Sequence, residues 1–225
     1  MNYFSRIRLN PTRRDTRRLV GSPQAMHAAV MGSHPLGSAP DEGRVLWRLD
    51  RHANHDLELY VVSPSQPDFT GLVEQAGWPK VLTWDTTDYG LFLGRLAIGQ
   101  RWTFRLTANP VRAVAVEGGR GRVSPHLTAA QQEQWLLDHG RSWGFEIPTA
   151  ESGSFNVSVR ERHTAGFSRA TPESGGFERG RVAITRADFL GQLVVTDIEL
   201  FRRALTHGMG RAKAYGCGLM TLARP

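Results

Sequence analysis

The chain begins with an aromatic and aliphatic segment in which residues 6–10 alternate between polar and apolar side chains, with the period of two that is typical of a β-strand. Ile7 and Leu9 fall on one face and two arginines on the other, because successive side chains of a strand point to opposite sides. The pattern therefore predicts a strand over residues 2–10 that buries its aliphatic face.

Similar runs recur along the chain, either alternating or rich in β-branched and aromatic residues. The clearest covers residues 102–106, where apolar side chains alternate with Thr103 and Arg105 before Asn109 and Pro110 end the run. Further strands are predicted over residues 45–49, 57–63, 155–162, 181–185, 193–196 and 219–222.

Side-chain caps mark the starts of the predicted helices. Ser22 followed by Pro23 is typical of an N-cap and a first helical residue. Thr128 and Gln131 have the spacing of a capping box, and Asp197 is a further N-cap. The predicted helices cover residues 24–31, 69–76, 128–139 and 198–205.

Each half of the chain has approximately the order β-α-β-β-α-β, which is that of the ferredoxin-like fold and of the RNA-recognition module. We therefore expect an α+β protein with two tandem ferredoxin-like domains, residues 1–112 and residues 113–225. The glycine-rich residues 115–125 are expected to form a surface excursion near the boundary.

The composition fits a folded protein without a membrane span. Of the 225 residues, 40% are apolar and 22% are charged, which excludes a fibre or a disordered chain. No run approaches the roughly 18 apolar residues of a membrane span, and the N-terminal residues lack the apolar core of a secretory signal. Cys217 is the single cysteine, and no Cys/His set has zinc spacing. A cytoplasmic protein without a metal or other cofactor is expected.

The charge balance adds a candidate partner. The chain has 28 basic and 21 acidic residues, and only Lys80 and Lys213 among the basic ones are lysines. Arginine pairs with phosphate through a planar fork and stacks on bases, and the pI near 10.4 is typical of a nucleic-acid-binding protein. A GC-rich genome with solvated arginines is the alternative. It accounts for arginine over lysine but not for the excess of basic over acidic residues.

The segment GMGRAKAYGCGLMTLA, residues 208–223, is the densest motif. Gly208 and Gly210 allow positive φ angles, and successive N–H groups in such a loop can bind phosphate, with Arg211 and Lys213 adding charge. The segment follows a helix and precedes a strand, which excludes a dinucleotide fingerprint, and it lacks the Gly-Lys-Ser/Thr of a P-loop. A glycine-rich turn that packs a helix onto a strand is the alternative, and Cys217 within it is expected to be a small buried side chain.

His27 is the candidate for proton transfer, because a histidine titrates near neutral pH. It lies in the second turn of a predicted helix that follows four arginines, and a purely structural role is the alternative. The arginines that flank the predicted strands are candidates for an RNA groove, with a solvated sheet face as the alternative. They are Arg105 and Arg112 in the first set and Arg160, Arg162 and Arg169 in the second.

Four segments together resemble the CasE-type CRISPR repeat-RNA endoribonucleases, the crRNA-processing subunits of the Cascade complex. The residues 208–223 are similar to the glycine-rich signature of that family, and FRLTANP is similar to its FRLRANP strand end. SPQAMH resembles the family's helix start with its active histidine, and WRLD resembles a further strand. The likeness runs in order along the whole chain.

The resemblance implies a metal-independent endoribonuclease that binds the stem-loop of CRISPR repeat RNA and cuts at the 3′ base of the stem. The 2′-hydroxyl would attack the adjacent phosphorus, and His27 matches the family histidine that transfers a proton. The other subunits of the Cascade complex are the implied protein partners.

The chain departs from the family pattern at three positions. Gln24 stands where some members have a tyrosine, Gly32 where some have a lysine, and Thr107 where an arginine is common. Ser33 and His34 are nearby candidates for a second acid or base. An RNA-hairpin-binding module that does not cut, and more remotely a nucleotide-binding enzyme, therefore remain alternatives.

Overall fold

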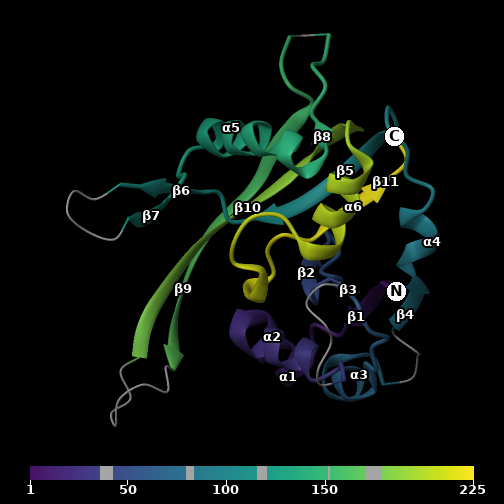
Figure 1. Ribbon diagram of the computed structural model, residues 1–225. Coiled ribbons are helices and arrows are strands. Elements are labelled where there is room, and N and C mark those ends of the chain that lie inside the picture. The colour runs from purple at the N-terminus through teal and green to yellow at the C-terminus, as the bar shows by residue number, and fades with distance from the viewer. Residues whose placement is uncertain (36–42, 80–83, 116–120, 152, 171–178) are drawn as a thin grey trace.

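The computed structural model describes residues 1–35, 43–79, 84–115, 121–151, 153–170 and 179–225, with the backbone alone at 165, 167–170 and 179–183. It is an α+β structure built around two antiparallel sheets (Figure 1). No helix in the described part of the chain is both long and apolar enough to cross a membrane.

The first sheet has the strand order β2-β3-β1-β4, with every neighbouring pair antiparallel. Its strands are β1 (Tyr3–Leu9), β2 (Leu46–Arg51), β3 (Leu57–Ser63) and β4 (Trp84–Asp88). Three helices pack with it, α1 (Arg14–Gly21), α2 (Pro23–Met31) and α3 (Thr70–Ala76). Ile7 and Leu9 of β1 are buried in the core beneath these helices, which confirms the predicted face of the first strand.

The second sheet has the strand order β11-β5-β10-β8, and β9 pairs with β10. Its strands are β5 (Arg101–Ala108), β8 (Phe145–Glu146), β9 (Val157–Ala170), β10 (Arg179–Val195) and β11 (Met220–Ala223). The helical elements of this half are α5 (Ala129–Gly140), η2 (Arg141–Trp143), α6 (Ile198–His207) and η3 (Lys213–Tyr215). A short helix, α4 (Tyr89–Leu93), leads from the first sheet to the second.

The predicted helix caps are confirmed. The Ser22 hydroxyl accepts from the N–H of Ala25 and starts α2. Thr128 and Gln131 form the capping box of α5. The Asp197 carboxylate accepts from two N–H groups in the first turn of α6. A capping side chain satisfies free backbone N–H groups within its own turn, so these interactions are visible in the local sequence.

Two predicted elements differ from the structure. The arginine-rich stretch before Ser22 forms α1, which buries Thr16 and Leu19 and exposes most of its arginines. The two short strands predicted at 181–185 and 193–196 are parts of one continuous strand, β10, paired along most of its length with β9. Backbone hydrogen bonds to β9 continue through polar residues, so side-chain alternation alone ended the predicted strands too early.

The β9–β10 pair extends away from the rest of the molecule, as Figure 1 shows. A smaller hairpin, β6 (Val111–Val114) and β7 (Arg122–Pro125), occupies the predicted excursion at 115–125, of which residues 116–120 lie outside the described part.

The two halves share buried side chains. Leu46 and Val62 of the first sheet belong to the core of the second half, with Phe104 and Phe189. The strand β5 precedes the predicted domain boundary at 112 and 113, yet it pairs with β10 and β11 of the second sheet. The division of the chain at that boundary stays a prediction.

Candidate functional site

A cleft of about 690 Å³ opens where the two halves meet. Residues of α1 and α2 line one part of it, and residues of the β9–β10 pair line another. The strands β2 and β5 supply further lining residues. Five arginines line it, and we call it the arginine cleft: Arg48, Arg51, Arg105, Arg162 and Arg186.

The floor of the arginine cleft contains a buried ion pair. Arg48, 1% exposed, donates from Nε and Nη2 to the two carboxylate oxygens of Asp50, at 2.7 and 2.9 Å. Its Nη1 donates to the carbonyl of Arg105 at 2.7 Å, and Nη2 donates to the hydroxyl of Thr221 at 2.7 Å. Arg48 therefore fastens β2 of the first sheet to β5 and β11 of the second.

Arg105 lies between two carboxylates. Its Nη2 donates to Asp188 at 3.0 Å, and its Nη1 is 3.3 Å from Asp50. Burial lowers the pKa of Arg105, but the hydrogen bond to Asp188 and the negative charges of Asp50, Asp188 and Glu161 raise it by more, so the pKa lies above its usual value. Thr107, buried on the same strand, donates to the other Asp188 oxygen at 2.6 Å. The hydroxyl at this position thus has an internal partner on β10.

Arg51 and Arg186 differ from Arg105, because neither has a carboxylate within 4.0 Å in the described part of the chain. They carry positive charge in the cleft that a bound anion can neutralise.

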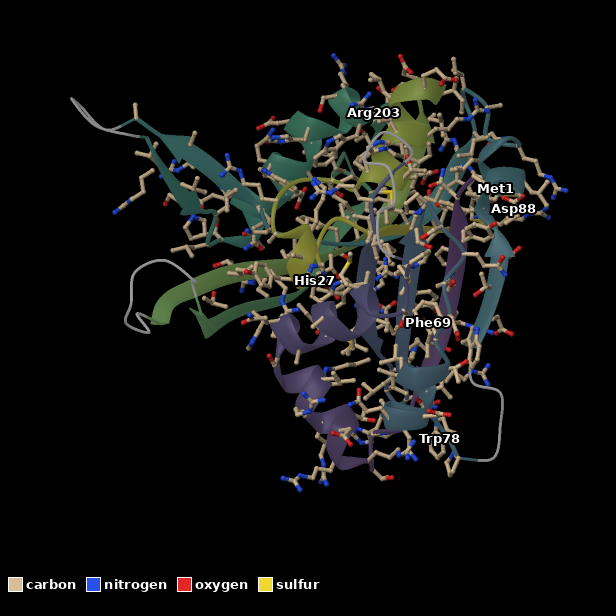
Figure 2. The ribbon with its side chains drawn as sticks, turned by 60° about the horizontal axis from the view of Figure 1, so that its bottom comes forward. Met1, His27, Phe69, Trp78, Asp88 and Arg203 are labelled. Atoms are coloured by element: carbon tan, nitrogen blue, oxygen red, sulfur yellow. The ribbon has the colours of Figure 1, made fainter. Side chains whose placement is uncertain are left out.

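His27 lies on α2, one residue after Met26, which lines the arginine cleft. Figure 2 shows it on the side of α2 that faces the C-terminal segment, and α2 packs against η3 of that segment. The ring is half-buried, its Nδ1 is buried with no hydrogen-bond partner, and burial lowers the pKa of His27 below its usual value. The ring is therefore neutral at pH 7 and can accept a proton.

Two further candidates for proton transfer are directed elsewhere. Burial lowers the pKa of His34 to about 4, and its ring meets Phe69 edge-on in the core of the first half. The Ser33 hydroxyl, just after the end of α2, donates to the carbonyl of Ala29 in that helix. Gln24 is exposed in the first turn of α2. Neither Ser33 nor His34 lines the arginine cleft.

The glycines of the C-terminal segment allow it to pack closely on large side chains. A Cβ atom at Gly216, where φ is +81°, would lie 2.7 Å from Cζ3 of Trp47. One at Gly208 would lie 2.7 Å from Cδ2 of Leu46, and one at Gly210 would lie 3.3 Å from the Trp135 ring. These glycines therefore let the segment join the two halves.

Part of the same loop is closed by internal bonds. The N–H of Met209 donates to Gly218, and the N–H of Gly218 donates to Thr107. The ammonium of Lys213 donates to the carbonyl of Gly210 at 2.7 Å, and burial lowers its pKa, with the charge of Arg44 adding to the effect. Arg211 is exposed. Cys217 is buried as expected, and burial raises the pKa of its thiol to about 12.

The other predicted arginines are spread more widely. Arg162 is exposed at the arginine cleft, and its guanidinium donates to the carbonyl of Leu127 at 3.3 Å. Arg160 lines a smaller neighbouring pocket of about 260 Å³. Arg112 is exposed on β6, away from the residues that line either pocket. Arg169 lies in β9, and its side chain is outside the described part.

The sequence patterns did not single out Asp50, which pairs with Arg48, or several residues that line the cleft: Arg48, Arg51, Glu161, His163, Arg186 and Asp188. The segment WRLD contained a signal, because Arg48 and Asp50 alternate within a strand whose neighbours are also apolar. Asp188 and Arg186 carried no such signal, since they lie between the two short strands that were predicted.

The helix α2 thus carries a half-buried imidazole next to Met26, which lines a cleft that also contains five arginines. Such a site can hold phosphates and accept a proton beside them. Within the described residues, no group of three His, Cys, Asp or Glu side chains is placed to hold a metal ion.

A family described as CRISPR associated protein matches residues 2–224. The CRISPR-associated endoribonuclease Cse3 of Thermus thermophilus is 30% identical over 225 residues, which cover 98% of this chain and 99% of that protein.

Two solved structures have the same fold over the whole chain. Thermus thermophilus Cse3 bound to an RNA that represents a pre-cleavage complex is 26% identical, with a TM-score of 0.77 and coverage of 99% and 98%. A chain of a CRISPR RNA-guided surveillance complex, 21% identical with a TM-score of 0.68 and coverage of 99% and 100%, shares the fold.

Proposed function

The chain belongs to the family of CRISPR associated proteins, and from its likeness to the endoribonuclease Cse3 over 98% of the chain we propose that it cuts CRISPR repeat RNA. The substrate is the stem-loop of the repeat, which is cut at the 3′ base of the stem to give mature crRNA. The observation that carries the proposal is the position of a neutral His27 on the helix that walls an arginine-lined cleft.

The reaction proposed is attack of a 2′-hydroxyl on the adjacent phosphorus. The P–O bond to the 2′ oxygen forms, the bond to the 5′ oxygen breaks, and the products carry a 2′,3′-cyclic phosphate and a 5′-hydroxyl. His27 accepts the 2′ proton, which its neutral form permits. The 5′ oxygen receives a proton from the solvent or from a second group.

The arginine cleft supplies the positive charge that the reaction needs. No carboxylate of the described residues neutralises Arg51 or Arg186, so they can pair with RNA phosphates and with the charge that develops on the phosphorane. Arg105 is held by two carboxylates, and we propose that it orients the cleft as well as contacting RNA.

The closed C-terminal loop supports a coupled role for its residues. Gly208 and Gly210 let the loop pack on Leu46 and Trp135, and Lys213 bonds the carbonyl of Gly210. Because η3 of the same segment lies against α2, we propose that the loop fixes the environment of His27, while the exposed Arg211 remains available to RNA. Arg112, Arg160 and Arg162 are exposed, and these three together with Arg169 of β9 stay proposed RNA contacts.

Cleavage of the stem-loop repeat from the protein's own genome in excess EDTA tests the reaction. A 5′-hydroxyl product with a cyclic phosphate is expected, without added metal. Cleavage that requires a divalent ion would exclude the metal-independent reaction.

The role of His27 is tested by His27→Ala and His27→Gln, with His139→Gln as a control on a histidine of α5. Both His27 variants should lose at least about 100-fold in single-turnover rate, which is the low end for a proton-transfer group. Hairpin affinity should be retained. An unchanged cleavage rate would remove His27 from this role.

A hairpin-binding module that does not cut is the second candidate, favoured by the glutamine at position 24, which cannot readily exchange a proton. Tight binding without any cyclic-phosphate product in the EDTA assay would support it.

The likeness of folds supports three further parts of the proposal. The order β4-β1-β3-β2 of the first sheet is that of a ferredoxin-like repeat, and the path β11-β5-β10-β8 of the second has the same order once β9, which also pairs with β10, is set aside. We therefore propose a ferredoxin-like duplication, assembly with the other subunits of the Cascade complex, and a cytoplasmic location.

A further inference from the structure

The β9–β10 pair contains a bulge at the wall of the arginine cleft. The register between the strands shifts at Asp188, where one residue of β10 stands opposite two residues of β9, Arg160 and Glu161. A bulge twists its strand and redirects side chains, and bulges are common beside active sites. Here the redirected Glu161 lines both the arginine cleft and the smaller pocket next to it.

Among the described acidic residues that line the cleft, Glu161 differs from Asp188 in having no ion-pair partner. Asp50 and Asp188 are both bonded to arginine, so their charge is already balanced. The Glu161 side chain is exposed and makes no ion pair or hydrogen bond within the described part of the chain. Its charge nevertheless acts on Arg105 across the cleft.

A free carboxylate is unfavourable in a cleft that holds an RNA backbone, because it repels phosphates. It becomes favourable when it accepts hydrogen bonds from N–H groups of a base. Cytosine N4 and the N1 and N2 groups of guanine are such donors. The adenine amino group lies between two ring acceptors, N1 and N7, which repel a carboxylate, and uracil offers only its N3–H. Arg51 and Arg160 line the smaller pocket around Glu161 and can hold the phosphates on either side of that base.

We propose that Glu161 is a specificity-determining residue that accepts hydrogen bonds from a cytosine or guanine of the repeat RNA, an inference that rests on the proposed function. The bulge opposite Asp188 directs it to this base, while the unpaired arginines hold the backbone.

The experiment measures dissociation constants for the stem-loop repeat with a 2′-deoxy nucleotide at the cleavage position, which prevents attack. Inosine replaces single guanines and removes their N2 amino group, and pyrimidin-2-one replaces single cytosines and removes their N4 amino group. Each RNA is measured with the wild type, with Glu161→Ala and with Glu161→Gln. Glu74→Ala is the matched control, because it removes one exposed negative charge from α3, outside the cleft.

In the wild type and in Glu74→Ala, one modified position should weaken binding by about 5- to 100-fold. In Glu161→Ala the same modification should weaken binding by less than 2-fold, and in Glu161→Gln by an intermediate factor. The class of the modified base identifies guanine or cytosine as the contact. A change in affinity that is equal for every RNA, or the same penalties in all four proteins, would overturn the inference.

The proposed function fails separately. A wild type that binds the unmodified repeat no more tightly than a scrambled hairpin of equal length would overturn the proposed substrate and the inference with it. Specific binding with no penalty that depends on Glu161 would overturn the inference alone.

Discussion

Replacing Arg48 with methionine should destabilise the protein by about 3–5 kcal/mol, the usual cost of removing one partner from a buried ion pair. Arg48 is 1% exposed and Asp50 is 3% exposed, so water cannot replace the lost donors. The substitution leaves the Asp50 carboxylate with Arg105 at 3.3 Å, and it leaves the Arg105 carbonyl without the guanidinium. The lost energy is a large part of the 5–15 kcal/mol by which native domains are usually stable.

Urea denaturation followed by circular dichroism and by tryptophan fluorescence measures the loss. Arg6→Ala is the matched control, because its pair with Asp85 has side chains that are 39% and 77% exposed, and such pairs contribute about 1 kcal/mol or less. The double variant Arg48→Met with Asp50→Asn should recover part of the loss, because no uncompensated carboxylate remains. A midpoint for Arg48→Met as close to the wild type as that of Arg6→Ala would refute the role assigned to the buried pair.

Three further outcomes follow from single positions. Gly216→Ala should destabilise the protein by about 2–4 kcal/mol in urea denaturation, because φ at this position is +81° and the new Cβ would lie 2.7 Å from Trp47. Gly71→Ala is its control and should be neutral or stabilising, because a Cβ at this position of α3 meets no atom within 4 Å. Burial lowers the pKa of His34 from 6.5 to about 4, so the unfolded chain binds the proton first and the free energy of unfolding should fall as the pH drops through this window. In His34→Phe, the difference between the free energies of unfolding measured at pH 7 and pH 4.5 should be smaller than in the wild type. The acid limb of the pH profile of kcat/KM for repeat cleavage should lie below 6.5, because burial lowers the pKa of the His27 base; a limb above 7 would contradict that assignment.

Local interactions explain which elements could be predicted from the chain. The caps at Ser22, Thr128 and Asp197 satisfy N–H groups within their own first turns, so neighbouring residues suffice to define where those helices start. The alternation in β1 was equally visible, because one face of that strand is buried by helices. His27 was found from its place in a motif, and its helix was predicted from the Ser22 cap.

The long β9–β10 pair could not be predicted in the same way. Its polar residues break the alternation, and the hydrogen bonds that continue the strand come from a partner strand. Whether each arginine pairs with phosphate or with a carboxylate is also a question of distant partners. Arg105 and Asp188 are 83 positions apart in the chain, and Arg48 and Thr221 are 173 apart.

Periodicity, caps and the ordered motifs were enough for the α+β class, for most of the helices and for the candidate histidine, because each depends on residues close together in the chain. The tertiary structure decided which charged side chains are paired inside the protein and which remain available to a ligand. Arg48 and Arg105 are bound to carboxylates that folding brings beside them, while Arg51, Arg186 and Glu161 line the cleft with no ion-pair partner in the part of the chain that the structure describes. The physical reason is that the strength of an ion pair depends on distance and burial, and both are set by how the two sheets pack.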